Sequence, residues 1–184
     1  TDAELAERLD VRRLRGHTLS LRGELAQDFT PLPEDFDIDA AFERVDSDAV
    51  DLVAELAMLE MISGRVAKAQ RLIEWVRRSG VPAGPQGELH LCMAVAWFHG
   101  REGTFEPGLE IAERGIELAD GSRGYETSRV RPTSVAAVLL DSLGRGDEAL
   151  HMLRAAQDAP GPRWTKPLLQ FGAALTLYRR GEWD

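Results

Sequence analysis

The side chains that could do chemistry in this chain are few and scattered. Four histidines and one cysteine are present, and no His-x-x-x-His or Cys-x-x-Cys pair occurs among them. His90 and Cys92 are the closest pair, but residues two apart on a helix point away from each other. A lone cysteine among small helical residues indicates packing more often than a nucleophile. The sequence therefore predicts neither a metal centre nor a cofactor.

One acidic stretch, from Asp35 to Asp46, has a spacing similar to that of a calcium-binding loop. Its sixth position is Ala40, where the sharp turn of such a loop needs glycine, and no bidentate glutamate closes it. The position of Asp46 favours another role, because an aspartate just before a helix caps that helix and places a negative charge at its first turn. We expect a helix cap here, with calcium as the weaker alternative.

Patterns typical of enzymes are also missing from the sequence. It holds no Gly-x-x-x-x-Gly-Lys-Ser/Thr loop for nucleotide phosphates. Glu110, Glu113 and Glu117 recur at helical spacing, with Arg114 beside them, which is typical of an exposed charged face. We expect no catalytic activity, and the function must then come from the surfaces of the fold.

The composition is that of a folded chain with an acidic surface. Of its 184 residues, 43% are hydrophobic and 29% are charged, and the net charge is −9. Because phosphate contacts need clustered Lys and Arg, this balance argues against nucleic-acid binding. One cysteine fits a reducing compartment, and we find neither an apolar run of membrane-spanning length nor a secretory signal. We predict a cytoplasmic chain that binds neither nucleic acid nor membrane.

Loop glycines recur at a nearly constant interval along the chain. Similar turns occur, at intervals of 41, 39, 41 and 37 residues, at Gly23, Gly64, Gly103, Gly144 and Gly181. A period of this size is typical of stacked helical hairpins. The sequence predicts an all-α fold, a right-handed solenoid of antiparallel helix hairpins with a period of about 40 residues.

Small residues keep phase with these glycines. Seven residues before them stand Gly16, Ala57, Ala96, Ala137 and Ala174. Five residues after the first four stand Asp28, the one exception, and then Ala69, Gly108 and Ala149. Small side chains at these offsets let two antiparallel helices approach closely. Alanine is common in helices generally, but that does not explain the shared phase.

The hairpins are predicted from this phase and from the loop residues. A single helical-repeat domain would span residues 1–184, with an irregular first hairpin at 2–45 because Pro31 and Pro33 forbid a regular helix there. Regular hairpins follow, with their helices at 49–63 and 66–79, 87–98 and 105–119, and 123–143 and 147–157. Pro132 moves the start of the helix in 123–143 to that residue or just before it.

Half a hairpin remains at 166–184, so that the last helix has no mate. Its apolar face would stay exposed unless further sequence or another chain covers it. We expect the chain to be a piece of a longer polypeptide, because it also lacks an initiator Met, and we expect a tendency to form homo-oligomers.

One face of the first helices carries more Met and aromatic side chains than a solvated face needs. In a hairpin solenoid these helices line the concave side. The residues that would turn inward, named the predicted groove, are Met58, Met61, His90, Met93, Trp97, Arg101, Arg131, Phe171 and Tyr178. Such side chains suit an adaptable pocket or a docked helix. Alternatively, tight curvature packs them against neighbouring hairpins as core, and both interpretations are open at this point.

The repeats resemble tetratricopeptide-type hairpins, most clearly in LGRGDEALHMLRAA at 143–156 and LTLYRRGEWD at 175–184. In addition, RLRGHTLSLRGE at 13–24 and the later hairpin LVAELAMLEMISGRVAKA are similar to the helical-repeat region of large ATP-binding LuxR-family transcriptional regulators. The resemblance implies that an ATPase module precedes the repeats and a helix-turn-helix DNA-binding domain follows them, both outside these residues. It implies that the repeats sense a small-molecule effector or a protein partner. The alternative is a free-standing adaptor, similar to tetratricopeptide proteins, that binds a partner peptide.

Overall fold

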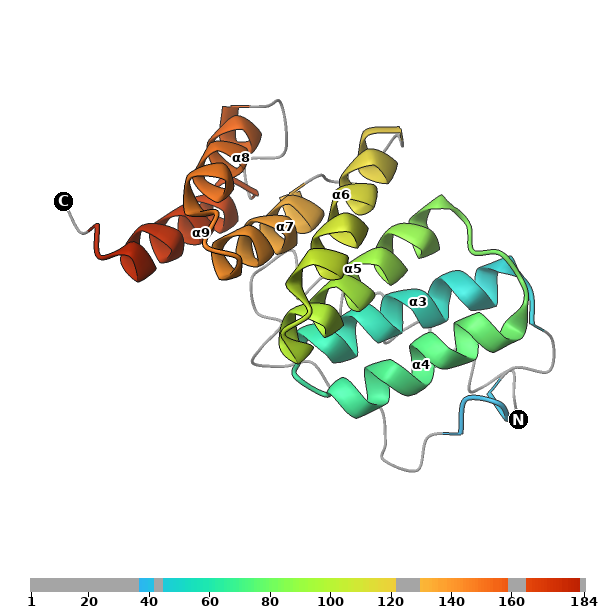
Figure 1. Cartoon of the computed structure of the whole chain (residues 1–184). Coiled ribbons are helices and arrows are strands. Elements are labelled where there is room, and N and C mark those ends of the chain that lie inside the picture. The colour runs from blue at the N-terminus through green and yellow to red at the C-terminus, as the bar shows by residue number, and fades with distance from the viewer. Residues whose placement is uncertain (1–36, 42–44, 122–129, 159–164, 183–184) are drawn as a thin grey trace. The chain divides into compact units, whose positions relative to one another are not determined.

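In the computed structural model, which describes residues 37–41, 45–121, 130–158 and 165–182, every regular element is an α-helix (Figure 1). The helices are α3 (Ser47–Ile62), α4 (Val66–Ser79), α5 (Pro85–Glu102), α6 (Phe105–Gly121), α7 (Val130–Ser142), α8 (Gly146–Asp158) and α9 (Thr165–Arg180). The predicted all-α class is confirmed for these residues. The predicted first hairpin at 2–45 and its turn at Gly23 lie almost entirely outside them.

The chain divides into two compact units, Thr1–Ala94 and Val95–Asp184, and the boundary falls inside α5. The sequence predicts a single domain. Because the structure forms two units, each is considered by itself.

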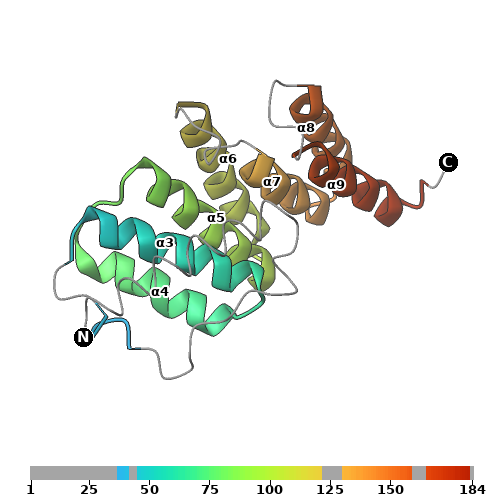
Figure 2. The same ribbon diagram turned by 180° about the vertical axis from the view of Figure 1, so that it is seen from behind.

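In the first unit, α3 and α4 lie side by side as a hairpin (Figures 1 and 2). The side chain of Asp46 accepts a hydrogen bond from the Ala49 N–H at 3.0 Å, so it caps α3 as predicted. Nearly every residue of α3 is buried, whereas α4 buries a stripe that contains Ala69, Leu72 and Val76. A first helix that is apolar on all sides and a second helix that is amphipathic therefore make up this hairpin.

The start of α5 is held by Asp51 of α3. Its carboxylate accepts a hydrogen bond from the Gly84 N–H at 2.7 Å, which places a negative charge at the N-terminus of α5. A Cβ atom at Gly87 would lie 2.8 Å from the Asp51 Cα, so only glycine permits this approach. The helix also continues to Glu102, beyond the predicted end at Phe98. Gly100 lies within this helix, and a Cβ at its position would lie 3.1 Å from the Leu139 Cδ2.

The four hairpin turns in the described residues share one backbone conformation. Gly64, Gly103, Gly144 and Gly181 have φ angles of 80°, 75°, 75° and 74°, in the left-handed region that favours glycine. The residue after each glycine donates its N–H to a carbonyl five residues earlier, at 2.9 to 3.0 Å, in the pairs Arg65 to Glu60, Thr104 to His99, Arg145 to Leu140 and Glu182 to Leu177. These bonds are the Schellman motif, which satisfies the last carbonyls of a helix.

Side chains close two of these turns at the same positions. The Arg65 guanidinium forms an ion pair with the buried carboxylate of Glu60. In the next turn, His99 Nδ1 lies 2.8 Å from Thr104 Oγ1. The residues joined by the backbone bond are therefore also joined through their side chains.

In the second unit, α7 contacts α6, its hairpin partner α8, and also α9. α7 begins at Val130, so Pro132 lies in its first turn, where a missing N–H costs no hydrogen bond. This agrees with the predicted start. α8 packs against both α7 and α9, and the Gly172 backbone of α9 meets the Leu153 side chain of α8.

The small residues before and after a turn meet in the second unit. Ala96 lies seven residues before Gly103 and is fully buried. A Cβ atom at Gly108, five residues after that glycine, would lie 3.2 Å from the Ala96 carbonyl oxygen and 2.9 Å from the His99 Cβ. Glycine at this position lets α6 approach α5 closely.

This close approach predicts opposite effects of two helical glycine substitutions. Gly108→Ala should lower the free energy of unfolding by about 1–3 kcal/mol, because the added methyl group overpacks the contact with Ala96 and His99. Gly172→Ala should be neutral or should stabilise by up to about 1 kcal/mol, because alanine favours a helix and its Cβ would contact Leu153 at an ordinary 3.4 Å. Urea titration followed by circular dichroism compares the two variants. Stabilisation by both would contradict the close approach at Gly108.

Candidate functional site

Four residues of the predicted groove are buried in the structure. Met58 is 0%, Met61 and Met93 are 3%, and His90 is 4% exposed. They lie in the core and line no open surface, so for these four the structure corrects the groove interpretation in favour of the alternative, core packing. Met58 and Met61 are buried because α3 is buried on nearly all sides, and His90 and Met93 lie among the buried residues of α5, with Leu89 and Ala94.

The other five residues of the predicted groove differ in exposure. Trp97 is half-buried and Arg101 is exposed. Arg131 lies in α7, but its side chain is outside the described part of the structure. Phe171 and Tyr178, both on α9, are 66% and 59% exposed. Large apolar groups that remain this exposed are the ones that need a functional explanation.

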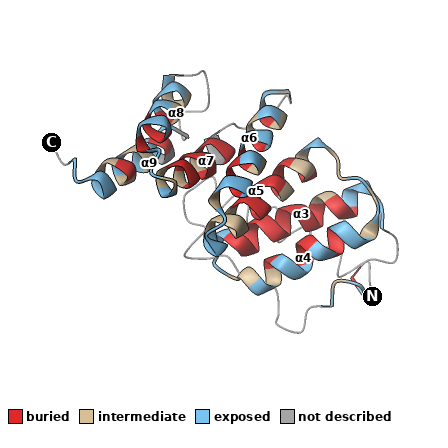
Figure 3. Ribbon diagram, in the orientation of Figure 1, coloured by how far each residue is buried: buried red, intermediate tan, exposed pale blue. Residues whose placement is uncertain are grey.

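α9 has two opposite apolar faces. On one face Leu169 is fully buried, Thr176 is 4% exposed and Gly172 contacts α8. The other face, at helical spacings of four, three and four residues, is exposed at every position and is named the α9 stripe: Pro167, Phe171, Ala174 and Tyr178. Figure 3 shows exposed residues along α9, whereas α3 is buried over most of its length.

The α9 stripe corresponds to positions that are mostly buried in α3 and α5, whereas in α7 the equivalent residues Ser134 and Asp141 are half-buried. Its members stand fourteen, ten, seven and three residues before Gly181. At the same distances before Gly64, exposed by 3% or less, stand Val50, Ala54, Ala57 and Met61. At the first three of these distances before Gly103, also exposed by 3% or less, stand Leu89, Met93 and Ala96. α9 therefore exposes positions whose equivalents are buried in α3 and in most of α5.

The covering element in a complete hairpin is its second helix. α4 packs on α3, α8 packs on α7, and Gly108 of α6 meets Ala96 of α5. No second helix follows Gly181 within the described residues.

Ion pairs hold α9 against its neighbours at the end of the stripe. The Arg179 guanidinium lies 2.9 Å from Asp141 of α7, whose side chain is only 8% exposed. Arg180 lies 2.6 Å from Asp147 of α8 and 2.7 Å from Glu182. The hydrogen bond to Asp147 raises the pKa of the Arg180 guanidinium. These contacts fix the orientation of α9.

A recess of ≈ 420 Å³ surrounds these ion pairs, lined by Asp141, Ser142, Gly144, Gly146, Asp147, Arg179 and Arg180. Its two carboxylates and two guanidinium groups already bind each other, so a charged ligand would have to displace one of them. The Ser142 hydroxyl donates to the Val138 carbonyl oxygen at 2.8 Å. The recess therefore serves to join α7, α8 and α9, and its groups are not arranged around a ligand.

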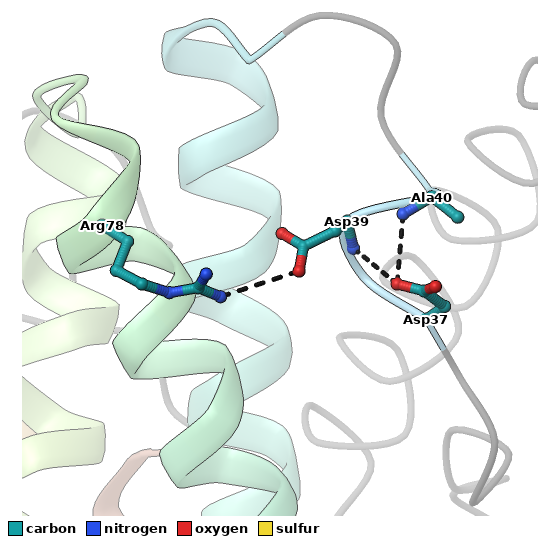
Figure 4. Close-up of polar contacts among 4 residues, drawn as sticks. All are labelled: Asp37, Asp39, Ala40 and Arg78. Carbon is teal, nitrogen blue, oxygen red and sulfur yellow. Dashed lines mark hydrogen bonds and ion pairs between the residues drawn. The ribbon is translucent and has the colours of Figure 1, made fainter.

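The acidic residues of the stretch 35–46 that the structure describes, Asp37, Asp39 and Asp46, each bind a different partner. The Asp37 carboxylate accepts hydrogen bonds from the N–H groups of Asp39 and Ala40, at 3.0 and 3.2 Å. The Asp39 carboxylate lies 3.7 Å from the guanidinium of Arg78 in α4. Figure 4 shows the two carboxylates engaged with these separate partners. Together with the cap made by Asp46, this favours the structural interpretation over the calcium-loop alternative.

Metal binding and membrane crossing can be assessed for the described residues. No three His, Cys, Asp or Glu side chains in them are placed to hold a metal ion. None of the helices that the structure describes combines the length and the apolar character needed to cross a membrane.

Comparison with known proteins gives no match for this chain. No protein-family model matches it, and neither a curated protein nor a solved structure matches it significantly. A function can therefore be proposed only from the chain's own residues.

Two members of the α9 stripe, Pro167 and Ala174, are absent from the predicted groove. Ala174 does stand in the phase of small residues that marks helix contacts, and that signal locates the face. The sequence predicts an apolar face on the last helix that stays exposed unless further sequence or another chain covers it, and Phe171 and Tyr178 are exposed there in the structure.

Met93 and Phe171 provide a matched test, because both stand ten residues before a turn glycine. Met93→Ala should lower the free energy of unfolding by about 2–5 kcal/mol, since it empties a core position. Phe171→Ala should change it by no more than about 0.5 kcal/mol, since the ring is exposed. Denaturant titration of both variants provides the comparison. Equal losses would mean that Phe171 is a core residue.

Proposed function

We propose that this chain is a non-catalytic helical-repeat interaction module and that its α9 stripe binds an amphipathic helix of a protein partner. The observation that carries the proposal is the exposure of Phe171 and Tyr178 on a face whose equivalents, where the structure describes them in α3 and α5, are buried. Aromatic side chains dominate the energetics of protein interfaces. An amphipathic helix is the kind of partner that such a face buries in the chain's own hairpins.

We further propose that the hairpins stack as a right-handed solenoid. In support, the same turn occurs four times in the described residues. In addition, α7 contacts α9 as well as its own partner α8, which is the contact between successive first helices that stacked hairpins require. In such a stack, the stripe would lie on α9, which takes the place of the first helix in its hairpin.

The expected affinity is weak. Burying two aromatic side chains gains about 3–6 kcal/mol, while association costs about 4 kcal/mol or more. The net gain of at most about 2 kcal/mol corresponds to a dissociation constant of about 30 mM or weaker, so tighter binding needs flanking contacts or a tether that raises the effective concentration. Such weak contacts suit a signal that must be reversible.

The setting proposed for this module is a LuxR-family transcriptional regulator, which rests on the sequence resemblance alone. In that setting the ATPase and DNA-binding domains lie elsewhere in the polypeptide. Binding of a partner or effector to the repeats would shift the regulator between two arrangements that differ in their affinity for it. A free-standing adaptor would instead act without those domains.

Binding to the stripe can be measured with a probe peptide that has the sequence of residues 145–158, which contains α8. We expect chemical-shift changes on α9 when an isotope-labelled chain is titrated with the peptide. The double variant Phe171→Ala/Tyr178→Ala should bind at least tenfold more weakly, because it removes the apolar face. The double variant Lys166→Ala/Gln170→Ala, exposed on the same helix but outside the stripe, should bind normally. Equal binding by both variants, or no binding, would contradict the proposed function.

The setting has a separate test. An antibody raised against this segment should detect, in an extract of cells that express it, a band several-fold larger than 20.3 kDa. That result is expected because a regulator carries flanking domains. A native band close to the size of this segment would favour the free-standing adaptor.

A further inference from the structure

The two faces of α9 differ in how apolar they are, and the more apolar face is the exposed one. The packed face includes the buried Leu169 and Thr176, and also Gly172, whose backbone meets α8. The exposed α9 stripe carries two aromatic side chains, Phe171 and Tyr178. An aromatic side chain removes more apolar surface from water when it is buried than a glycine or a threonine does. Hydrophobic burial alone would therefore turn the α9 stripe toward α7 and α8.

The residues between the two faces favour neither orientation. Leu175 and Leu177 are both half-buried, and residues two apart on a helix point to nearly opposite sides. Half a turn of α9 about its axis would exchange these two flanks and leave both side chains about equally covered. In addition, Ala174 gives the stripe a small side chain at its centre, which permits close approach to a neighbouring helix as Gly172 does on the packed face.

The polar contacts of α9 oppose this rotation. The Arg179 guanidinium lies 2.9 Å from Asp141 of α7, and the Arg180 guanidinium lies 2.6 Å from Asp147 of α8. The Arg180 stem lies against the α8 backbone, because a Cβ at Gly146 would be only 3.0 Å from the Arg180 Cδ. Rotation that buried the stripe would carry both guanidinium groups away from these carboxylates.

The two ion pairs are not equivalent. The side chain of Asp141 is 8% exposed, whereas that of Asp147 is 89% exposed. A solvated carboxylate loses little when its cation leaves, because water takes the place of the guanidinium. A largely buried carboxylate is not hydrated in this way, so the loss of Arg179 from Asp141 is costly. This buried pair is therefore the contact that can outweigh the burial of two aromatic side chains.

We propose that α9 has two packed orientations and that the Arg179–Asp141 pair selects the one that exposes the α9 stripe. In the second orientation the stripe packs against α7 and α8, and Leu169 turns outward. Separation of Arg179 from Asp141 shifts the population toward this second orientation and withdraws the stripe from solvent. The inference rests on the proposed function for the role of the stripe. The orientation itself is measured without a partner, so failure of the probe peptide to bind would contradict the proposed function alone.

Two introduced thiols report the orientation from opposite faces of α9. Ala174→Cys places a thiol in the exposed stripe, and Thr176→Cys places one on the packed face, where the native side chain is 4% exposed. The native Cys92 is buried, and the chain without either substitution gives the background rate. We expect a water-soluble maleimide to label the thiol at position 174 at least tenfold faster than the thiol at position 176.

Each reporter is then combined with Asp141→Leu/Arg179→Met, which removes the ion pair without leaving a buried charge unpaired. We expect the labelling rate at position 174 to fall and the rate at position 176 to rise, each at least fivefold. Unchanged rates would overturn the selecting role of the pair. Fast labelling at both positions would mean that α9 detaches and does not rotate, which would also overturn the proposal.

Two control variants separate the ion pair from general effects. Asp141→Arg/Arg179→Asp restores an ion pair at the same place and should return both rates to within twofold of their starting values. Arg145→Gln/Glu148→Gln removes an exposed ion pair that does not include α9, and it should leave both rates unchanged. Circular dichroism checks that every variant keeps its helices. Rates in the swapped variant equal to those of the neutral variant would overturn the role of the charges.

Discussion

The backbone conformation of the turn glycines is the constraint on which the rest of this structure depends. At each turn a positive φ angle lets the following N–H return to the last carbonyls of the helix. A residue with a Cβ atom pays about 1–2 kcal/mol to adopt this conformation, so glycine marks the position in the sequence. Because the turn is identical each time, it also sets which residues of the two helices face each other. Ala96 meets Gly108 for this reason.

A first helix that carries apolar residues on several sides needs cover on each of them. α3 has that cover and is buried almost throughout. α9 has the same kind of sequence, but only the face with Leu169 and Gly172 is packed. The opposite face presents Phe171 and Tyr178 to solvent. The proposed binding surface is this second, exposed face of α9.

The ion pairs of α9 make this surface a defined one. Arg179 reaches the largely buried Asp141 of α7, and Arg180 reaches Asp147 of α8. Exposed ion pairs contribute little stability. Breaking the pair between Arg179 and Asp141 would nevertheless be costly, because the largely buried Asp141 carboxylate would remain without its cation. Two anchors on different helices limit the rotation of α9. A binding face on a fixed helix loses less conformational entropy when a partner docks.

The sequence by itself determined the all-α class, the four turn glycines that the structure describes and the cap at Asp46, because each depends on interactions within a few residues. The close contact of small residues was also readable, since the turn fixes the register between the two helices. The sequence could not separate core from surface in the predicted groove. Met93 and Phe171 stand at the same place relative to their turns, yet one is 3% and the other 66% exposed. Only the tertiary structure decided this, because burial depends on which other elements pack against a residue, and the local pattern is the same at both positions.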